Sequence, residues 1–378
     1  MEALKFTGSG SEYFKIWIVN ILLTIITLGM YIPWAKVRNR RYFYANSMLA
    51  DRNFEYHATG KQLFLGFIIG LVLFIIYSFI AQTAPQFAGI FMILFMLVLP
   101  WLIWKSLMFN MKMTSFSNVH FAFKGKLGTS YKIFLGYPAL FFFFIIIIGV
   151  SSALLTNFLL NGGIIPKSIM LGGGVVLGLL FTLGYLYFFA IIKKFTTTYT
   201  LSNTYYGQGK VETKLETKKF FIILLKALGL VLIPFVLLSI VITPTLMGGA
   251  MIAGAEIIFV LAYFGFIFFM MLVASYVVSR ERKYVYESTL LDNKIGFEST
   301  LRARDLAWVM LSNLVLIMFT LGLAFPWAKV RMVKLMLENT LVDTSIGFDD
   351  YITIQQDNIS SIGDQIGDAF DVDVGVAF

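Results

Sequence analysis

The sequence lacks cysteine altogether, and it has only two histidines, His57 and His120, among 378 residues. The absence of cysteine excludes a disulfide framework, a thiolate metal site and a cysteine nucleophile. The histidines have no acidic cluster at ligand spacing beside them. We also find no phosphate-binding loop, nucleophile elbow or paired acids inside an apolar segment. We therefore expect no metal, no cofactor and no enzymatic activity.

Charged residues are also scarce. They make up 13% of the chain, whereas hydrophobic residues make up 58%. A soluble domain carries about 25% charged residues, so this chain cannot form an ordinary water-facing surface. Apolar runs long enough to cross a ~30 Å hydrocarbon layer recur along it. The first run lacks a small-residue cleavage site, so we expect it to be retained.

We identify eight hydrophobic segments, at residues 16–34, 63–81, 87–104, 133–160, 168–192, 220–243, 250–279 and 306–327. The loops after segments one, three, five and seven contain 23 of the 30 Lys and Arg residues. The loops after segments two, four and six contain only Lys167. The positive-inside rule places the first set of loops in the cytoplasm and the second set outside. Topology thus explains the net charge of +9, and we expect no nucleic-acid partner.

The two ends of the chain repeat one module. The hexapeptide of residues 33–38, Pro-Trp-Ala-Lys-Val-Arg, returns unchanged at residues 326–331, and Asn20 and Thr27-Leu28-Gly29 return as Asn313 and Thr320-Leu321-Gly322. If segments one and eight both span the membrane, the two hexapeptides lie on opposite faces. If both segments break near their glycines and re-enter, the hexapeptides share the cytoplasmic face, which favours this alternative. Irregular backbone at membrane depth requires covering helices.

A weaker repeat of short aromatic pieces follows five of the segments. The pieces lie at residues 46–49 and 54–56, 114–116 and 121–123, 199–201 and 205–206, 288–290 and 297, and 339–341 and 348. Their alternation predicts short strands that pair on the cytoplasmic face; the alternative is a set of unrelated interfacial loops. We therefore predict an all-α polytopic membrane protein with short β-structured cytoplasmic loops. It has six transmembrane segments if the two end segments are re-entrant and eight if they span.

This pattern divides the chain into an N-terminal repeat module (1–62), a central membrane bundle (63–305), a C-terminal repeat module (306–342) and an acidic tail (343–378). The tail contains eight aspartates, and its polar composition predicts poor order.

A few polar residues fall inside the apolar segments. Asn20, Thr24 and Thr27 share one helix face, and Asn313 and Thr320 repeat that pattern. These stripes either line a polar path or pack helices together through hydrogen bonds. Two ionisable residues, Glu256 and Lys226, are further candidates for a path, although both lie near segment ends.

Tryptophan and basic residues adjoin each other in both hexapeptides, a pairing typical of the headgroup level. They either anchor the chain at the interface or bind anionic lipid headgroups. The candidate residues are Trp34, Lys36, Arg38, Arg40, Arg41, Trp327, Lys329 and Arg331.

Residues 6–10, 13–17, 33–46 and 54–60, with the acidic ending at residues 369–375, are similar to a known bacterial family. The sequence resembles the YjgN-like inner-membrane proteins, a family of unknown function. The resemblance implies a multi-pass protein of a Gram-negative inner membrane, with membrane lipids as partners, and it supplies no activity. Two function classes remain open. One is a transporter or channel for a small solute or lipid, and the other is a non-transporting scaffold that binds anionic lipid or a protein through its basic cytoplasmic face.

Overall fold

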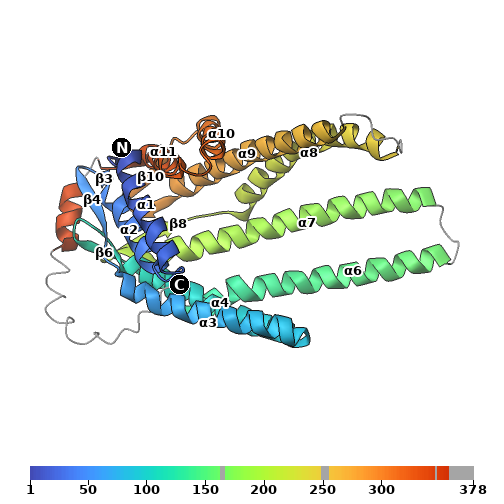
Figure 1. Ribbon diagram of the computed structural model, residues 1–378, viewed down its shortest axis with the longest axis horizontal. Coiled ribbons are helices and arrows are strands. Elements are labelled where there is room, and N and C mark those ends of the chain that lie inside the picture. The colour runs from blue at the N-terminus through green and yellow to red at the C-terminus, as the bar shows by residue number, and fades with distance from the viewer. Residues whose placement is uncertain (162–166, 248–254, 345–346, 357–378) are drawn as a thin grey trace.

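The computed structural model describes residues 1–161, 167–247, 255–344 and 347–356; next to the first two gaps, some helical residues are described by their backbone alone. A small β-barrel forms one end of the molecule, and long helices project from it (Figure 1).

Within the described residues, eleven short strands form one antiparallel sheet, in the order β1-β11-β10-β9-β8-β7-β6-β5-β4-β3-β2. They are β1 (Glu2–Ala3), β2 (Lys5–Phe6), β3 (Ser47–Leu49), β4 (Arg52–Tyr56), β5 (Thr114–Phe116), β6 (Val119–Phe123), β7 (Thr204–Tyr206), β8 (Gly209–Thr213), β9 (Thr289–Leu291), β10 (Ile295–Ser299) and β11 (Thr340–Val342). The two edge strands, β1 and β2, belong to one N-terminal segment and are separated only by Leu4. β1 pairs with β11 and β2 pairs with β3, so this segment nearly closes the sheet into a barrel.

The all-α prediction is therefore wrong. Strands of two to five residues are too short to show a clear period-2 pattern, and the long apolar helices dominate the composition. The predicted pairing of short strands is confirmed, with two errors of position. Residues 199–201 still belong to a helix, and Phe348 begins a helix rather than a strand. The strand that pairs with β11 on the side away from β10 is β1, which comes from the N-terminus.

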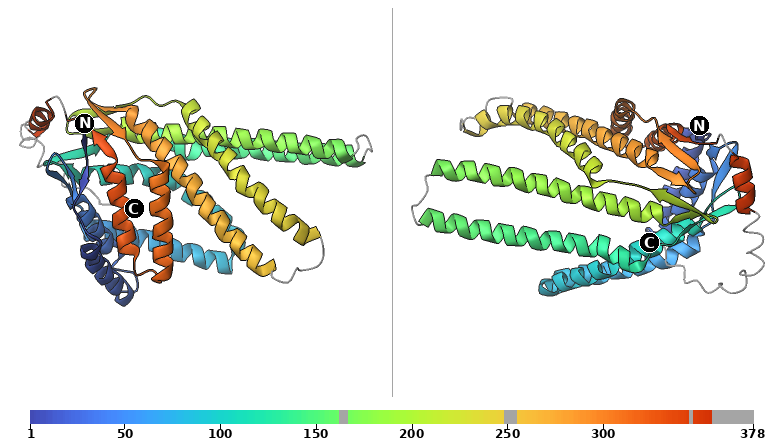
Figure 2. Two further views of the ribbon diagram at one scale, coloured as in Figure 1. Left: turned by 90° about the horizontal axis from the view of Figure 1, so that it is seen from above. Right: turned by 180° about the vertical axis from the view of Figure 1, so that it is seen from behind.

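The helices form hairpins that leave the barrel from one strand and return to the next. Their bounds are α1 (Gly10–Ile26) and α2 (Ile32–Ala45); α3 (Gly60–Thr83) and α4 (Pro85–Lys112); α5 (Leu127–Tyr131), which continues through the π-helical turn η1 (Lys132–Gly136) into α6 (Tyr137–Asn161), and α7 (Lys167–Ser202); α8 (Thr217–Met247) and α9 (Ala255–Glu287); α10 (Ala303–Phe319) and α11 (Phe325–Glu338). The hairpins spread away from the barrel in all three views (Figures 1 and 2).

Five stretches of the described residues are long and apolar enough to cross a membrane: Gly60–Thr83, Pro85–Lys112, Leu127–Leu154, Val176–Ser202 and Val260–Glu287. They coincide with predicted segments two to five and seven. Segment six coincides with α8, which is 31 residues long.

Segments one and eight are each broken into two helices. Leu28 and Gly29 have φ values of 50° and 91°, and Leu321 and Gly322 have φ values of 49° and 91°. A glycine adopts this left-handed conformation without steric cost, so the chain turns back at each repeat. Because the strands before and after each pair lie in the same sheet, both end segments return to the barrel they left. This is the arrangement of the re-entrant alternative, and α1 also packs against α11.

The hairpins follow one repeating plan, in which each returning helix continues into a short strand. In the part of the chain that the structure describes, five residues in equivalent positions donate a side-chain hydroxyl to the carbonyl four residues earlier, over 2.6 to 2.9 Å. They are Ser47, Thr114, Thr204, Thr289 and Thr340. We name the five units after these residues: each module is a returning helix, a strand, a second strand and the helix that leaves. The fifth module joins α11 and β11 to the N-terminal segment and α1.

The core lies inside the barrel. Val119 is fully buried, and Phe116, Tyr206 and Val342 are each 4% exposed. A short helix over residues 348–356 covers the end of the barrel that bears the hairpin turns, with Ile352 packed in the core. Gln355 Oε1 accepts a hydrogen bond of 2.7 Å from the Gln208 amide in one of those turns. Poor order is therefore the wrong prediction for this part of the tail; residues 345–346 and 357–378 lie outside the described residues.

Candidate functional site

The asparagines of the two end segments join the helices of their own hairpins. Asn313 Oδ1 accepts a hydrogen bond of 3.0 Å from Arg331, and its amide donates to the Ala328 carbonyl over 2.9 Å. Asn20 accepts from Arg38 over 3.4 Å and donates to Asn39 over 3.0 Å. The arginine of each hexapeptide thus returns to the asparagine 18 residues before it.

The threonines of the same stripes bond to their own backbone. Thr27 and Thr320 each donate to the carbonyl four residues earlier over 2.7 Å and accept an amide four residues later over 3.0 Å. Thr24 donates to the Asn20 carbonyl over 2.7 Å. These contacts are the ones expected if the polar stripes pack helices together through hydrogen bonds. That the stripes line a polar path stays a prediction. Lys226 is exposed on α8, and the side chain of Glu256 lies outside the described residues.

Each hexapeptide tryptophan packs on the first residue of a neighbouring hairpin. Trp34 covers Gly60 and Trp327 covers Gly10, and a Cβ atom at either glycine would overlap the indole ring. The Trp34 ring lies 5.1 Å from that of Phe64, and the Trp327 ring lies 5.0 Å from that of Phe14. Each tryptophan therefore joins the returning helix and the leaving helix of one module, and so connects two adjacent hairpins, which is a structural role that the sequence did not reveal.

The basic residues of α2 divide into two groups. Arg40 donates to the Tyr56 hydroxyl over 2.7 Å, and Arg41 donates to the Ala58 carbonyl over 2.8 Å. These two arginines hold α2 to the end of β4 and to the segment that follows β4. Lys36 and Arg38 are exposed, although Arg38 also reaches Asn20 of its own hairpin.

Cations recur at the same distance from the barrel on every returning helix described. Arg38, Lys105, Arg280 and Arg331 each stand nine residues before the first residue of the next strand, and Lys36, Lys193, Lys194 and Lys329 stand ten or eleven residues before it. At a rise of 1.5 Å per residue this distance is about 14 to 17 Å. We call these eight residues the cationic collar. Sequence reasoning found its members in the hexapeptides and missed Lys105, Lys193, Lys194 and Arg280, because only the shared register of the modules places them together.

Besides Arg38 and Arg331, which bond to the asparagines of their own hairpins, two further collar residues contact other helices. Lys193 forms an ion pair of 2.9 Å with Glu281 of the neighbouring α9. Lys329 lies 5.0 Å from the centre of the Phe43 ring and 5.5 Å from that of Tyr13. Lys36, Arg38, Arg280 and Arg331 are the exposed members of the collar, and their exposure makes them the ones best placed to meet a ligand outside the protein.

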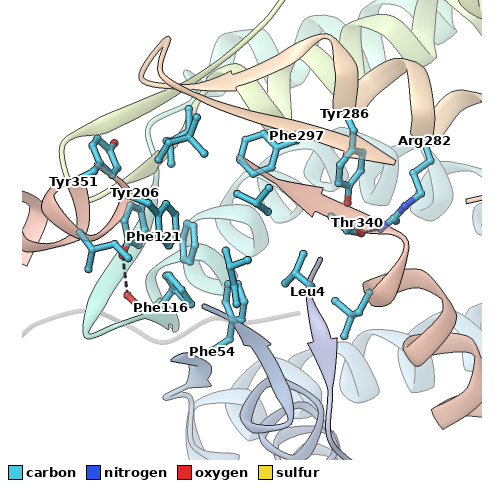
Figure 3. Close-up of a pocket in the computed structure, with 17 residues that line it drawn as sticks. Leu4, Phe54, Phe116, Phe121, Tyr206, Arg282, Tyr286, Phe297, Thr340 and Tyr351 are labelled. Carbon is cyan, nitrogen blue, oxygen red and sulfur yellow. Dashed lines mark hydrogen bonds between the residues drawn. The ribbon is translucent and has the colours of Figure 1, made fainter. Parts of the chain in front are cut away.

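The barrel encloses a cavity of about 300 Å³. Its wall is apolar and comes from every module, as Figure 3 shows. The lining residues include Leu4, Phe54, Phe121, Leu291, Phe297 and Val342. At the end near the turns, burial and the nearby Asp292 raise the pKa of Tyr351 to about 12, so this hydroxyl stays neutral.

One cation, Arg282, lies on the cavity wall at the end where α9 and α11 meet the barrel (Figure 3). It donates to the Met336 carbonyl over 3.0 Å and to the Thr340 hydroxyl, and it lies 4.5 Å over the Tyr286 ring. Its Nε atom is buried and has no hydrogen-bond partner among the described residues. In the same part of the chain, no Asp or Glu forms an ion pair with it.

Helical hairpins of membrane-spanning length, mounted on a barrel with a collar of cations at its junction with the helices, define a multi-pass membrane protein. The chain matches the model of the family described as "Bacterial protein of unknown function (DUF898)" over residues 1–369, and it belongs to that family.

Similar proteins agree with this placement. The chain is 30% identical over 360 residues to the inner membrane protein YjgN of Salmonella typhimurium, and the match covers 90% of this chain and 88% of the relative. It is 26% identical over 362 residues to the inner membrane protein YjgN of Escherichia coli K12, with the same two coverages. No solved structure matches the chain significantly. The protein is therefore a multi-pass protein of the bacterial inner membrane, as the resemblance implied.

Proposed function

We propose that this protein is a non-catalytic scaffold of the inner membrane that binds anionic lipid headgroups at the cationic collar. The observation that carries the proposal is the shared position of the collar cations about 14 to 17 Å from the barrel strands on each returning helix. A ring of cations at the level where apolar helices meet a polar domain is the arrangement that attracts anionic lipids.

The charge distribution supports a cytoplasmic barrel. The basic loops of the topology prediction contain the barrel strands and the collar, and such loops face the cytoplasm. The cytoplasmic leaflet attracts each nearby Lys or Arg by about 1 kcal/mol. The collar therefore faces a membrane surface whose negative potential attracts its cations.

Transport of a small solute is the other function that the sequence left open. A polar path requires Asn20 and Asn313 to face a common space, whereas each is 6% exposed or less and bonds within its own hairpin. These contacts favour the scaffold over the transporter.

The test measures lipid bound at the collar. The full chain is placed in nanodiscs with spin-labelled phosphatidylglycerol, and the motionally restricted fraction is recorded for a triple variant, Lys36→Gln, Lys105→Gln and Arg280→Gln. We expect a several-fold loss of restricted phosphatidylglycerol and no change for phosphatidylcholine.

A matched triple variant removes three exposed cations from the barrel strands and turns, Lys5→Gln, Lys210→Gln and Lys294→Gln. It loses the same charge away from the collar, so we expect it to behave as the unmodified chain does. If both triple variants lost the same amount of restricted phosphatidylglycerol, net charge alone would attract the lipid, and the proposal of a binding site at the collar would be wrong.

A further inference from the structure

The cavity inside the barrel has the size and lining of a ligand site. Its volume of about 300 Å³ stands at the lower end of the range for small-molecule pockets. Such a volume equals the share of roughly ten water molecules in the liquid. Water needs two to four polar partners at each position, and the wall offers almost none. An alkyl chain satisfies this wall better than water does.

Arg282 gives the cavity a polar end. A guanidinium donor that is buried without a partner is costly, and Arg282 Nε is such a donor among the described residues. The carbonyl of Met336 and the hydroxyl of Thr340 hold the other side of the guanidinium in place. A carboxylate or phosphate would pair with the remaining donors, because both match the planar guanidinium.

The neighbouring carboxylate does not serve this purpose. Glu281, the residue before Arg282, pairs with Lys193 over 2.9 Å. Glu281 thus neutralises the collar residue Lys193. Among the described residues, no carboxylate neutralises Arg282.

We propose that the barrel cavity binds a single-chain anionic amphiphile, with its acidic headgroup on Arg282 and its alkyl chain along Leu291, Phe297 and Val342. The cavity is too small for the paired chains of a bilayer phospholipid, so the ligand is a fatty acid or a single-chain phosphate. This site is separate from the collar, because none of the eight collar residues lines the cavity.

The test uses a thiol inside the cavity. Because the native chain has no cysteine, the introduced thiol is the one that the reagent modifies. Leu291→Cys places the thiol on the cavity wall, and Leu290→Cys places one on the neighbouring residue, which is 40% exposed and is not among the lining residues. The full chain in phosphatidylcholine nanodiscs is treated with methyl methanethiosulfonate. The rate of modification is measured with decanoate, decyl phosphate, decanol or decyltrimethylammonium present.

We expect decanoate or decyl phosphate to slow modification of the Leu291→Cys variant at least tenfold, with decyltrimethylammonium giving little protection. Protection by decanoate identifies fatty acids as ligands, and protection by decyl phosphate alone identifies single-chain phosphates. The rate for Leu290→Cys should not change with any of them. Equal protection by the cationic and anionic amphiphiles, or no protection at all, would overturn the proposal.

Two substitutions on α9 separate the roles of its arginines. Adding Arg282→Gln should remove the preference for anionic amphiphiles, whereas adding Arg280→Gln, which removes an exposed cation two residues away, should leave it intact. If Arg282→Gln prevents folding, the comparison of anionic with cationic amphiphiles in the Leu291→Cys variant still shows whether the cavity prefers anionic amphiphiles. If decanoate or decyl phosphate still protects the Leu291→Cys thiol when the triple collar substitutions are added, binding in the cavity does not depend on headgroup binding at the collar.

Discussion

The barrel and the helical hairpins bury their apolar side chains by different means. Inside the barrel, Phe116 is 4% exposed because strands and the cap helix from distant parts of the chain surround it. On α6, Phe142 is 64% exposed, and in α3, α4 and α7 as well no more than 11% of the candidate span is buried by the protein. The barrel is thus stabilised by the chain itself, whereas the long hairpins rely on the membrane to cover them.

This difference predicts losses of stability of very different size for the same substitution in the two regions. Phe116→Ala should lower the free energy of unfolding by about 3–5 kcal/mol, since it leaves a cavity in a packed core. Phe142→Ala should lower it by less than about 1 kcal/mol, because lipid fills the space. Equilibrium unfolding with sodium dodecyl sulfate in mixed micelles measures both. Similar losses would mean that α6 has a protein neighbour at Phe142.

The barrel should also depend on its closing segment. The Leu4 amide donates to the Thr340 carbonyl over 3.0 Å. Leu4→Pro removes this donor and leaves the carbonyl unpaired, at a cost of about 1–3 kcal/mol. Leu4→Met keeps the amide and nearly the same volume, so it should cost less than about 1.5 kcal/mol. The same unfolding measurement compares them. A tolerated proline would indicate that the sheet does not close through this segment.

The end hairpins should fall between the two regions. Asn313→Leu removes the bonds that Asn313 makes with the Ala328 carbonyl and Arg331, at a cost of about 1–3 kcal/mol. Asn20→Leu should cost less because its bond from Arg38 is longer. Thr24→Ala removes only a bond to its own helix and serves as the control. If Asn313→Leu is as mild as Thr24→Ala, the asparagine does not hold the hairpin together.

The smallest effect belongs to the charged contact of the cap helix. Asp349 pairs with Arg52 over 3.1 Å, but its side chain is 78% exposed. Asp349→Asn should therefore change stability by less than about 1 kcal/mol after solvent screening. Ile352→Ala should cost about 2–5 kcal/mol. Hydrogen exchange over residues 348–356 distinguishes apolar from ionic attachment of the cap.

The sequence predicted the helical part of this fold well and the barrel poorly. Length and hydropathy located the six long segments, because one helix carries its whole signal in consecutive residues. Gly29 and Gly322 likewise marked the turns of the end hairpins, since their repeat is exact. The strands gave only local hints, in five short aromatic pieces between residues 46 and 348, and strand partners lie as far apart as Ala3 and Leu341.

The candidate site was predictable only in part. The hexapeptides supplied Lys36, Arg38, Lys329 and Arg331. The other collar residues lie on α4, α7 and α9, which do not carry the hexapeptide, so only the equivalent position of these helices in their modules identifies them. Arg282 has no sequence signal, because its lack of a partner follows from the packing of α9 against α11 and β11. Pairing of the two chain ends is what creates both the barrel and its cavity.

The closure of the barrel by the two chain ends is tested most directly by a disulfide between them. Ala3 and Leu341 are paired in the sheet, and paired strand residues have Cα atoms about 4.5–5.5 Å apart, which suits a disulfide. The double variant Ala3→Cys with Leu341→Cys should form an intramolecular disulfide upon mild oxidation in native membranes. Each single variant should form none. Failure of the double variant to crosslink, while both thiols remain reactive, would contradict a barrel closed by the N-terminal segment.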